Sequence, residues 1–451
     1  MHNASTFARI TLLAVGIAGA LAAADANAAA FQLKENSAKG LGRAFAGSAS
    51  APGDASIIVN NPAGMRQLDG RQFQADLSAV SFSAEFTGSG RNAGPTGPGT
   101  GTPISGGDGG DAGKIAAIPA AYFYTPIGEQ AHFGVSLSVP YGFATKYDSD
   151  WVGRYSGTRT EMETVDLGFS ASYDVNPYVS FGASVFVEHM TIELRNAIDY
   201  GAIVGQAGVP GFTPGSADGE LKIEGDNNAV GWTVGGLFSP DENTHIGISY
   251  RSKVEHKITG GDATFSGKTP QVTTILNGAR PGWFVDTKGR ATVTLPASAT
   301  LSVTHQVNDR LLVAADVTRT AWASAFDSVT IDYASNQPNS VLNFAYRDTT
   351  FASIGADYKI NDKLTFRGGL AYDQTPTTAE HRDVRVPDTT RKWVTLGLGY
   401  NASENMEFNV GYLHIFAKDP TVRAVSETGN VVSGKYDVVG DVLAASINYK
   451  F

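Results

Sequence analysis

The end of the chain alternates strictly between apolar side chains and polar or small ones. The apolar positions are Leu443, Ala445, Ile447, Tyr449 and Phe451, and between them lie Ala444, Ser446, Asn448 and Lys450. A period of two places each set on one face of a β-strand. A terminal apolar edge strand is an aggregation hazard in water, whereas in a closed membrane barrel it pairs with the first strand and lipid covers its apolar face. The pattern predicts an all-β transmembrane barrel, with an ordinary terminal strand as the alternative.

Connections of two lengths divide the rest of the chain. Short ones fall near 126–130, 176–177, 239–243, 308–309, 361–362 and 402–404, and long ones near 88–113, 142–160, 196–225, 259–288, 334–340, 376–389 and 418–434. They predict about 14 antiparallel strands, with short turns at one rim and long loops at the other. The loops near 201–225 and 270–288 carry apolar side chains, which indicates either a landing site for a hydrophobic ligand or packing of loop against loop.

The first 28 residues have the features of a secretory signal peptide. Arg9 precedes an apolar stretch at 10–23, and Ala26-Asn27-Ala28 is an A-x-A cleavage site. An uncleaved anchor is the alternative, although the apolar stretch is short for a membrane span. The chain has no cysteine and a net charge of −10. It therefore has no disulfide framework, and the acidic balance argues against nucleic acid as a partner.

These features together favour the outer membrane of a Gram-negative cell. The terminal aromatic Phe451 also resembles the signal that the outer-membrane barrel-assembly machinery reads, so we expect that machinery and outer-membrane lipid as partners. A closed barrel needs no second copy to bury its edges, so we expect a monomer.

Between the signal peptide and the first strand lies a segment without strand alternation or a long helical stripe. Residues 31–68 are rich in glycine and small side chains and allow short helical turns around 37–46. We expect a signal peptide at 1–28, an N-terminal hatch at 29–70 that plugs the barrel, and the barrel itself at 71–451. An open diffusion porin has no need of such an insert, so the hatch favours a gated transporter.

The start of the mature chain carries several short motifs in order, namely Phe31-Gln32-Leu33, Ser37, Gly40-Leu41-Gly42-Arg43-Ala44, Ala46-Gly47, Asp54-Ala55 and Asn61-Pro62-Ala63. In these residues it resembles the FadL family (FadL, TodX and OMPP1) of outer-membrane transporters for hydrophobic compounds. The resemblance implies a 14-stranded antiparallel barrel with an N-terminal hatch. It also implies passive uptake, in which the ligand is held against the hatch and released sideways into the membrane.

The resemblance further implies where the ligand is held and released. Phe31 matches a position that contacts ligand, and Asn61-Pro62-Ala63 matches a tripeptide that anchors the hatch, where we expect a tight turn. The lateral gate is expected at Pro140-Tyr141-Gly142, at the outer end of a third strand over 131–141. Proline donates no ladder hydrogen bond and glycine leaves space beside it. The alternative is that Pro140 merely ends the strand.

A fatty-acid carboxylate in a pocket of low dielectric needs a cation. Arg347 shares its parity with lumen-facing positions of its predicted strand, so we expect it to bind the carboxylate. Arg195 resembles another family position, but its parity is that of lipid-facing residues, so it needs a bulge or lies beyond the bilayer. Arg391 is a third candidate. For each arginine the alternative is a salt bridge with a nearby carboxylate.

We expect a channel for passive uptake of hydrophobic compounds, with long-chain fatty acids as the first choice of ligand. Aromatic hydrocarbons such as toluene, taken up by the same route, are the alternative. An outer-membrane enzyme acting on lipids is an alternative of another class, but the sequence has no nucleophile elbow and its eight histidines lack metal-ligand spacing. We therefore expect no catalytic residue, no metal site and no cofactor.

Overall fold

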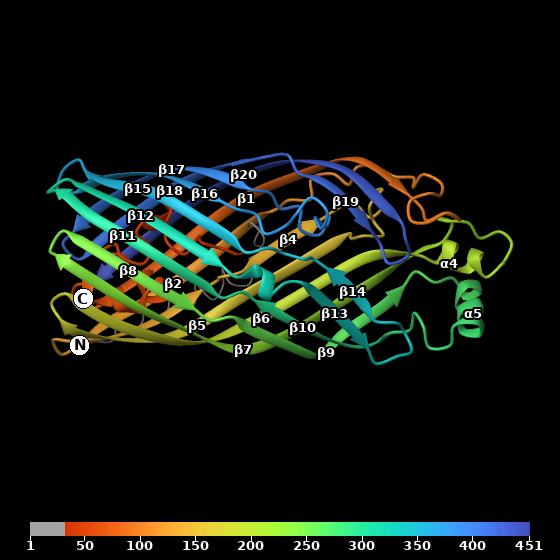
Figure 1. Cartoon of the computed structure of the whole chain (residues 1–451), viewed down its shortest axis with the longest axis horizontal. Coiled ribbons are helices and arrows are strands. Elements are labelled where there is room, and N and C mark those ends of the chain that lie inside the picture. The colour runs from red at the N-terminus through yellow and green to blue at the C-terminus, as the bar shows by residue number, and fades with distance from the viewer. Residues whose placement is uncertain (1–31) are drawn as a thin grey trace, which may run out of the picture.

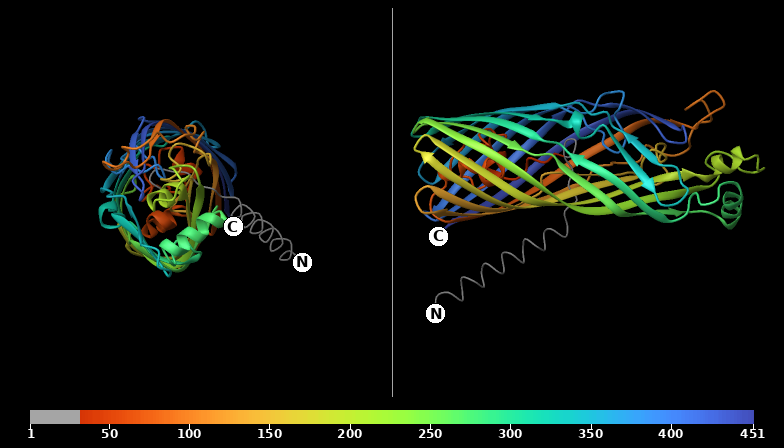
Figure 2. Two further views of the ribbon diagram at one scale, coloured as in Figure 1. Left: turned by 90° about the vertical axis from the view of Figure 1, so that its right-hand side faces the viewer. Right: turned by 60° about the horizontal axis from the view of Figure 1, so that its bottom comes forward.

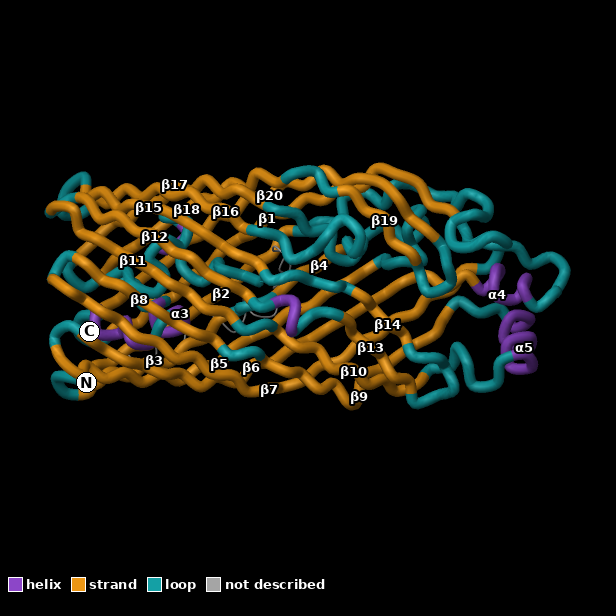
Figure 3. The backbone as a smooth tube through the Cα atoms, viewed as in Figure 1, coloured by secondary structure: helices purple, strands orange, loops and turns teal. Residues whose placement is uncertain are grey.

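The computed structural model describes residues 32–451. The expected signal peptide at 1–28 and the candidate ligand contact Phe31 lie outside the described residues. The strands wind at a slant around a long barrel, with helices α4 and α5 at one end and the C-terminus at the other (Figure 1). Nearly all of the wall is strand, and the longer loops gather at the end that carries the helices (Figure 3).

The sheet contains 20 strand segments that form fourteen wall strands, because six wall strands are interrupted. The eight continuous ones are β1 (Gln72–Arg91), β2 (Ile115–Ile127), β5 (Arg159–Asn176), β6 (Val179–Asp199), β7 (Asp218–Asp241), β16 (Leu364–Asp373), β17 (Arg391–Ser403) and β20 (Val431–Lys450). The interrupted ones are β3 (Ala131–Ser138) with β4 (Gly142–Lys146), β8 (Thr244–Arg251) with β9 (Val254–Ser266), β10 (Thr287–Leu295) with β11 (Ser298–Asn308), β12 (Leu311–Thr320) with β13 (Ser328–Tyr333), β14 (Ser340–Asn343) with β15 (Thr349–Lys359), and β18 (Met406–Ala417) with β19 (Thr421–Val425).

The last strand closes the barrel as its alternation predicts. β20 pairs antiparallel with β1 from Gln72↔Lys450 to Arg91↔Val431, without a shift of register. Leu443 and Tyr449 are exposed on the outer face, whereas Ser446 and Asn448 are buried in the lumen. An exposed apolar outer face and a polar lumen are the polarity of a membrane barrel rather than of a soluble one.

Hatch residues 32–71 lie inside the ring of strands, where the red segment is visible in Figure 2. The hatch contains α2 (Ala38–Leu41), α3 (Ile57–Asn60) and the 3₁₀ helix η2 (Pro62–Gln67). The helical turns expected around 37–46 are therefore present in α2. Asn61-Pro62-Ala63 opens η2 instead of forming an isolated turn, because the Asn61 side chain accepts a hydrogen bond from the Ala63 N–H at 3.2 Å.

Several segments that the sequence predicts as loops are ordered. The range 142–160 contains β4, and 418–434 contains β19 and the start of β20. The long loops also hold α4 (Tyr200–Gln206) and α5 (Pro270–Ala279), whose first turns are capped by the side chains of Asp199 and Thr269. The 3₁₀ helix η3 (Trp322–Ser324) interrupts the ninth wall strand. Within the described part of the chain, no helix is both long and apolar enough to cross a membrane.

Candidate functional site

The hatch is fixed to the wall at Asn61-Pro62-Ala63. The Asn61 side-chain amide is fully buried and donates to the Ala49 carbonyl at 2.8 Å and to the Gly236 carbonyl of β7 at 3.1 Å. A Cβ atom on Gly235 would lie 1.9 Å from the Asn61 Oδ1 atom. The wall therefore has glycine where the hatch approaches it most closely, and the tripeptide is in direct contact with β7.

A second set of contacts joins the other side of the hatch to the wall through charges. The Arg43 guanidinium lies 2.9 Å from the Asp357 carboxylate, and the Lys39 ammonium lies 3.1 Å from Glu407. Arg367 of β16 contacts both of these carboxylates. Burial acts to lower the pKa of Arg43, but the carboxylates of Asp357, Asp54 and Asp316 together outweigh burial and raise it. Removing one partner would leave a buried charge unpaired, so these contacts resist movement of the hatch.

The wall itself is broken at the position expected from Pro140. β3 ends at Ser138 and the same wall strand resumes at Gly142 as β4, so Pro140 interrupts the strand and does not end it. The expected strand over 131–141 is thus wrong in its last three residues. The Tyr141 N–H donates to the Thr164 hydroxyl at 3.1 Å, and the Thr164 N–H donates to the Tyr141 carbonyl at 2.9 Å. This exchange fixes the kink against β5.

The kink leaves a gap in the ladder between the second and third wall strands. The ladder between β2 and β3 runs from Ile127↔Ala131 to Ala121↔Leu137. Within residues 32–451, β4 forms a ladder with β5 and none with β2. Beyond the gap, the Lys146 N–H donates to the Ala112 carbonyl at 3.0 Å and joins the wall again. The ladder is therefore open beside residues 115–120 of β2.

The first described residues of the hatch lie against this break. Gln32 forms an isolated β-bridge with Tyr141, and the Leu33 N–H donates to the Pro140 carbonyl at 2.8 Å. Leu33 and Val139 are buried in one apolar cluster with Ile118 of β2. The inner side of the gap is thus covered by apolar side chains rather than by a strand ladder.

A cavity of about 110 Å³ lies between the hatch and the break. Its walls include Lys34 and Phe45 of the hatch, Val139 at the kink, Arg251 of β8 and Phe351 of β15. The cavity therefore combines apolar side chains with two cationic ones, with the carboxylate of Asp316 and with several hydroxyl and amide side chains.

Lys34 is a residue that the sequence analysis missed. Its ammonium lies 4.3 Å from the centroid of the Phe351 ring and forms no ion pair with any residue of 32–451. Burial lowers the pKa of Lys34, and Asp373, Asp316 and Glu35 offset this only in part. No sequence pattern identifies it, since Lys34-Glu35 looks like an ordinary pair on a solvated surface.

Arg251 faces the same cavity but its charge is neutralised. It lies 2.8 Å from Asp166 and 2.8 Å from Glu188, and its guanidinium stacks 3.9 Å from the centroid of the Phe186 ring. His256 is fully buried beside Glu188 at 3.0 Å. These contacts span β5 to β9, so no local sequence pattern identifies them.

Arg347 does not occupy the lumen-facing strand position that alternation with Ser353 and Asp357 predicts. β15 begins only at Thr349, so Arg347 lies before the strand and the alternation on which the prediction rested does not extend to it. Arg347 lies in the irregular connection between β14 and β15, with an exposed side chain whose Nε atom donates to the Thr375 carbonyl at 3.4 Å. It does not line the cavity at the hatch.

Arg195 and Arg391 are held by carboxylates, which is the alternative that the sequence left open. Arg195 lies on the outward face of β6 without a bulge, 2.8 Å from Glu193 and 3.7 Å from Glu220. Arg391 is buried at the start of β17, 2.6 Å from Asp373 and 3.8 Å from Asp388. Neither lines the cavity at the hatch.

Apolar side chains continue through the lumen from the helical end of the barrel to the hatch. Ile331 of β13 belongs to an outer cluster beneath α4 and α5, and Val329 on the same face belongs to a middle cluster. Tyr141 belongs to that middle cluster, and Val139 beside it belongs to the cluster at the hatch. An apolar surface therefore connects the outer rim to the broken wall strand.

Comparison with known proteins places the chain among outer-membrane transport proteins. The family described as "Outer membrane protein transport protein (OMPP1/FadL/TodX)" matches residues 19–451. The long-chain fatty acid transport protein of Escherichia coli O6:H1 is 29% identical over 420 residues, which cover 90% of this chain and 91% of that protein. Outer membrane protein P1 of Haemophilus influenzae is 28% identical and covers 91% of each chain.

Solved structures show the same fold. A FadL homologue of Pseudomonas aeruginosa superposes with a TM-score of 0.84 at 29% identity, covering 94% of this chain and 100% of that one. The toluene transporter TodX of Pseudomonas putida superposes with a TM-score of 0.65 at 21% identity, covering 94% and 100%. At 21% identity the second likeness concerns the fold alone.

Proposed function

The chain belongs to the OMPP1/FadL/TodX family of outer membrane transport proteins, and we propose that its cargo is a long-chain fatty acid. As a member of this family it is an outer-membrane β-barrel that transports hydrophobic compounds, and it is not an enzyme. We further propose that the cargo binds in the cavity between the hatch and the break in the wall, and that it leaves the barrel through that break.

The single observation that carries the choice of cargo is the ammonium of Lys34. A buried cation without an ion pair is unfavourable unless an anion joins it. Lys34 lines a cavity whose wall is partly polar, with Asp316 and Thr318, and partly apolar, with Phe45 and Val139. The apolar part lies next to the cluster of Leu33, Val139 and Ile118. A carboxylate at Lys34 with its alkyl chain on this cluster satisfies both halves of the site, whereas an aromatic hydrocarbon leaves the charge without a partner.

The exit follows from the position of this cavity. Val139, Pro140 and Tyr141 line it, and Pro140-Tyr141-Gly142 lies beside the open ladder between β2 and β4. We place the lateral gate at these three residues, with the alkyl chain leaving past Val139 into the membrane. The contacts of Asn61-Pro62-Ala63 with β7 support its role as the anchor that keeps the hatch in place. The driving force is the gradient of the ligand.

Aromatic hydrocarbons remain the second candidate, and one feature favours them. Trp322, Phe326, Phe344 and Tyr346 form an aromatic group in the middle cluster, with ring centroids 4.7 to 6.2 Å apart. Such a surface accommodates a flat ring as readily as an alkyl chain. Arg347, Arg195 and Arg391 lie away from the hatch cavity, so we assign the carboxylate to Lys34 in their place.

The test replaces Lys34 with methionine, which keeps the length and removes the charge. Cells that carry the variant are compared with the wild type in the uptake of oleate and of toluene, and Lys363→Met at an exposed turn is the matched control. Loss of one charged hydrogen bond is expected to lower the affinity for oleate by about tenfold or more, with toluene unchanged. Equal losses for both ligands, or no loss, would remove the fatty-acid assignment.

A further inference from the structure

The outer half of the wall lacks two of its strands on one side. β16 ends at Asp373 and β17 begins at Arg391, whereas the strands on either side continue outward as β14 and β19. β14 forms a ladder with β13, and β19 forms one with β20. No ladder joins β14 to β19 anywhere in 32–451. The wall is therefore open between these two strands, half a barrel away from the kink in the third strand.

The loop that connects β16 to β17 does not fill this opening but folds into the lumen. Its Val384 is fully buried, and the Val384 carbonyl accepts a hydrogen bond from the Tyr147 hydroxyl at 2.6 Å. The Arg385 carbonyl accepts one from the Thr145 hydroxyl of β4 at 3.0 Å. The loop thus reaches the opposite side of the barrel and leaves the space between β14 and β19 to a cavity.

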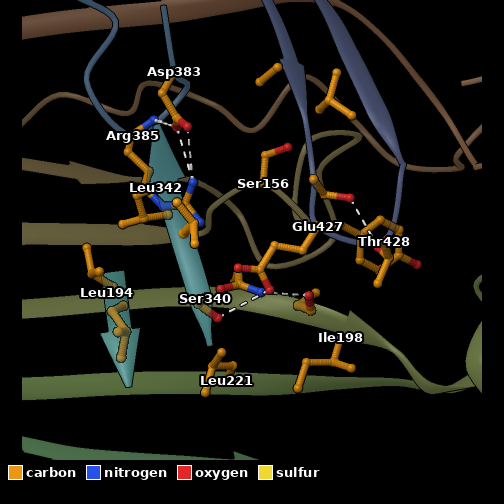
Figure 4. A pocket seen from close by; sticks show the side chains of 18 of the residues that line it. Ser156, Leu194, Ile198, Leu221, Ser340, Leu342, Asp383, Arg385, Glu427 and Thr428 are labelled. Atoms are coloured by element: carbon orange, nitrogen blue, oxygen red, sulfur yellow. Dashed lines mark hydrogen bonds and ion pairs between the residues drawn. The ribbon is translucent and has the colours of Figure 1, made fainter. Parts of the chain in front are cut away.

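That cavity has a volume of about 460 Å³, and Figure 4 shows some of the side chains that line it. Its lining includes Val341 and Val425, which are 53% and 47% exposed at the two edges of the opening. It also includes Leu194 and Ile198 of β6, which lie across the lumen. One hydrogen bond spans its outer end, from the Ser340 hydroxyl to the Glu427 carboxylate at 3.2 Å (Figure 4). We call this cavity the side port.

The side port contains two buried guanidinium groups. Arg385 is 9% exposed and binds Asp383 at 3.2 Å, but its Nε atom is buried and has no hydrogen-bond partner in the described chain. Arg382 is 8% exposed and donates to the carbonyls of Thr421 at 2.6 Å and Asp388 at 2.9 Å. An unpartnered buried donor is costly, so the site is incomplete without an acceptor.

The electrostatics agree with the geometry. Burial lowers the pKa of Arg382, and the positive charge of Arg347 lowers it further, while Asp388 acts in the opposite direction. A bound anion would offset the repulsion between Arg382 and Arg347. Apolar side chains line another part of the cavity, where Leu194, Ile198 and Ile331 face it. The carboxylates of Asp199, Glu380, Asp383 and Glu427 line the remainder together with neutral polar side chains. The buried guanidinium groups beside the apolar part fit an acyl chain that carries a carboxylate.

We propose that the side port is a second binding site of this barrel, which takes a single-chain carboxylate through the wall between β14 and β19. Arg385 and Arg382 hold the carboxylate, and the alkyl chain lies on Leu194, Ile198 and Ile331. This inference rests on the proposed function, because it takes the same class of cargo. Cargo entering from outside reaches the side port before the hatch cavity. Ile331 lies at the port, and Val329 on the same face of β13 belongs to the apolar cluster that includes Tyr141.

The arrangement of the outer end favours access from the side. Tyr200 of α4 packs on Phe284, which follows α5, with ring centroids 5.5 Å apart and an interplanar angle of 88°. Figure 2 shows the helices across the end of the barrel. A larger cavity of about 1060 Å³ at the rim shares Phe284, Val341 and Glu427 with the side port. A hydrophobic ligand that lands at the rim therefore reaches the port along its edge.

The test uses the absence of cysteine from the chain. Val425→Cys places one thiol at the edge of the port, and Lys435→Cys places one on the outward face of β20, next to Thr421 in the ladder. Oleate uptake by whole cells is measured for each variant before and after reaction with a bulky, membrane-impermeant maleimide. Labelling is expected to lower uptake several-fold at position 425 and to leave it unchanged at position 435.

A second measurement examines the head-group site in the purified full chain. Two sites predict a stoichiometry of two oleates per chain by equilibrium binding, and Arg385→Gln should leave one. Equal uptake before and after labelling at position 425, with one oleate in both wild type and Arg385→Gln, would overturn the side port and leave the cargo assignment standing. Failure of the wild type to take up or bind oleate would overturn the cargo assignment itself.

Discussion

The hatch and the third wall strand both close the lumen, but they do so with different kinds of contact. The hatch is held by buried hydrogen bonds and ion pairs, including those of Asn61 and the pair of Arg43 with Asp357. The wall at Pro140 is covered on its inner side by the apolar side chains of Leu33, Val139 and Ile118. Residues of the hatch and of the kink line the same cavity.

This difference indicates which closure opens for a hydrophobic cargo. Moving the hatch separates buried charges and leaves donors unsatisfied, at a cost of about 3–5 kcal/mol for each broken buried pair. Moving the side chains at the kink breaks no ladder bond, and an alkyl chain replaces the apolar contacts that are lost. We therefore propose that the cargo leaves through the wall, and that the hatch stays in place beneath the bound cargo.

The largest expected effect comes from blocking the wall. Val139→Trp places a larger side chain between the hatch cavity and the open ladder, where Val139 is already buried. We expect oleate uptake to fall to near background while the barrel still assembles, as judged by heat-modifiable migration on gels. Val135→Trp is the control, because Val135 lies on the lipid-facing side of β3 opposite Phe169. Equal uptake by the two variants would mean that cargo does not pass Val139.

The next largest effect concerns the hatch. Asn61→Ala removes two donated hydrogen bonds and the cap of η2, for a cost of about 2–4 kcal/mol. We expect the hatch to loosen and single-channel conductance in planar bilayers to rise. Asn60→Ala, which loses only the bond from Asn36, should conduct much less. An Asn61→Ala channel as closed as the wild type would show that the tripeptide is not the anchor.

The smallest effect is a pH dependence at the hatch cavity. Burial lowers the pKa of Lys34 from its ordinary value of 10.5. As the pH rises, the ammonium of Lys34 therefore loses its proton at a lower pH than an exposed lysine does. The affinity for ionised oleate should therefore decline as the pH rises through the lowered pKa of Lys34. Lys34→Arg keeps its charge, so its affinity should stay flat. Parallel pH profiles for wild type and variant, from equilibrium binding, would remove Lys34 from the site.

The sequence predicts most of the barrel because strand alternation and turns are local features. The pattern at Leu443 to Phe451 predicts the closing strand, its outward face and its pairing with β1, and the connections predict the number of wall strands. The motifs between Gly40 and Ala63 predict a hatch inside the barrel. These features depend on residues that are close together in the chain.

The site is less accessible to such reasoning because it depends on distant contacts. β4 exists because residues 142–146 pair with β5, and the loop from β16 to β17 turns inward because it finds Thr145 and Tyr147 across the lumen. The expected orientation of Arg347 fails because β15 begins two residues later, at Thr349, so strand alternation does not apply to Arg347. Lys34 is recognisable only when the packing around its ammonium is known.

The most direct test of lateral exit locks the hatch to the wall. The hydroxyl oxygens of Ser50 in the hatch and Ser302 in β11 are 2.7 Å apart and both residues are fully buried, so cysteines at these positions are placed to form a disulfide. Oleate uptake is measured for the Ser50→Cys, Ser302→Cys chain under oxidising and reducing conditions. If the cargo leaves through the wall beside Pro140, the two rates are equal. If oxidation stops uptake and reduction restores it, the hatch must move and the account is wrong.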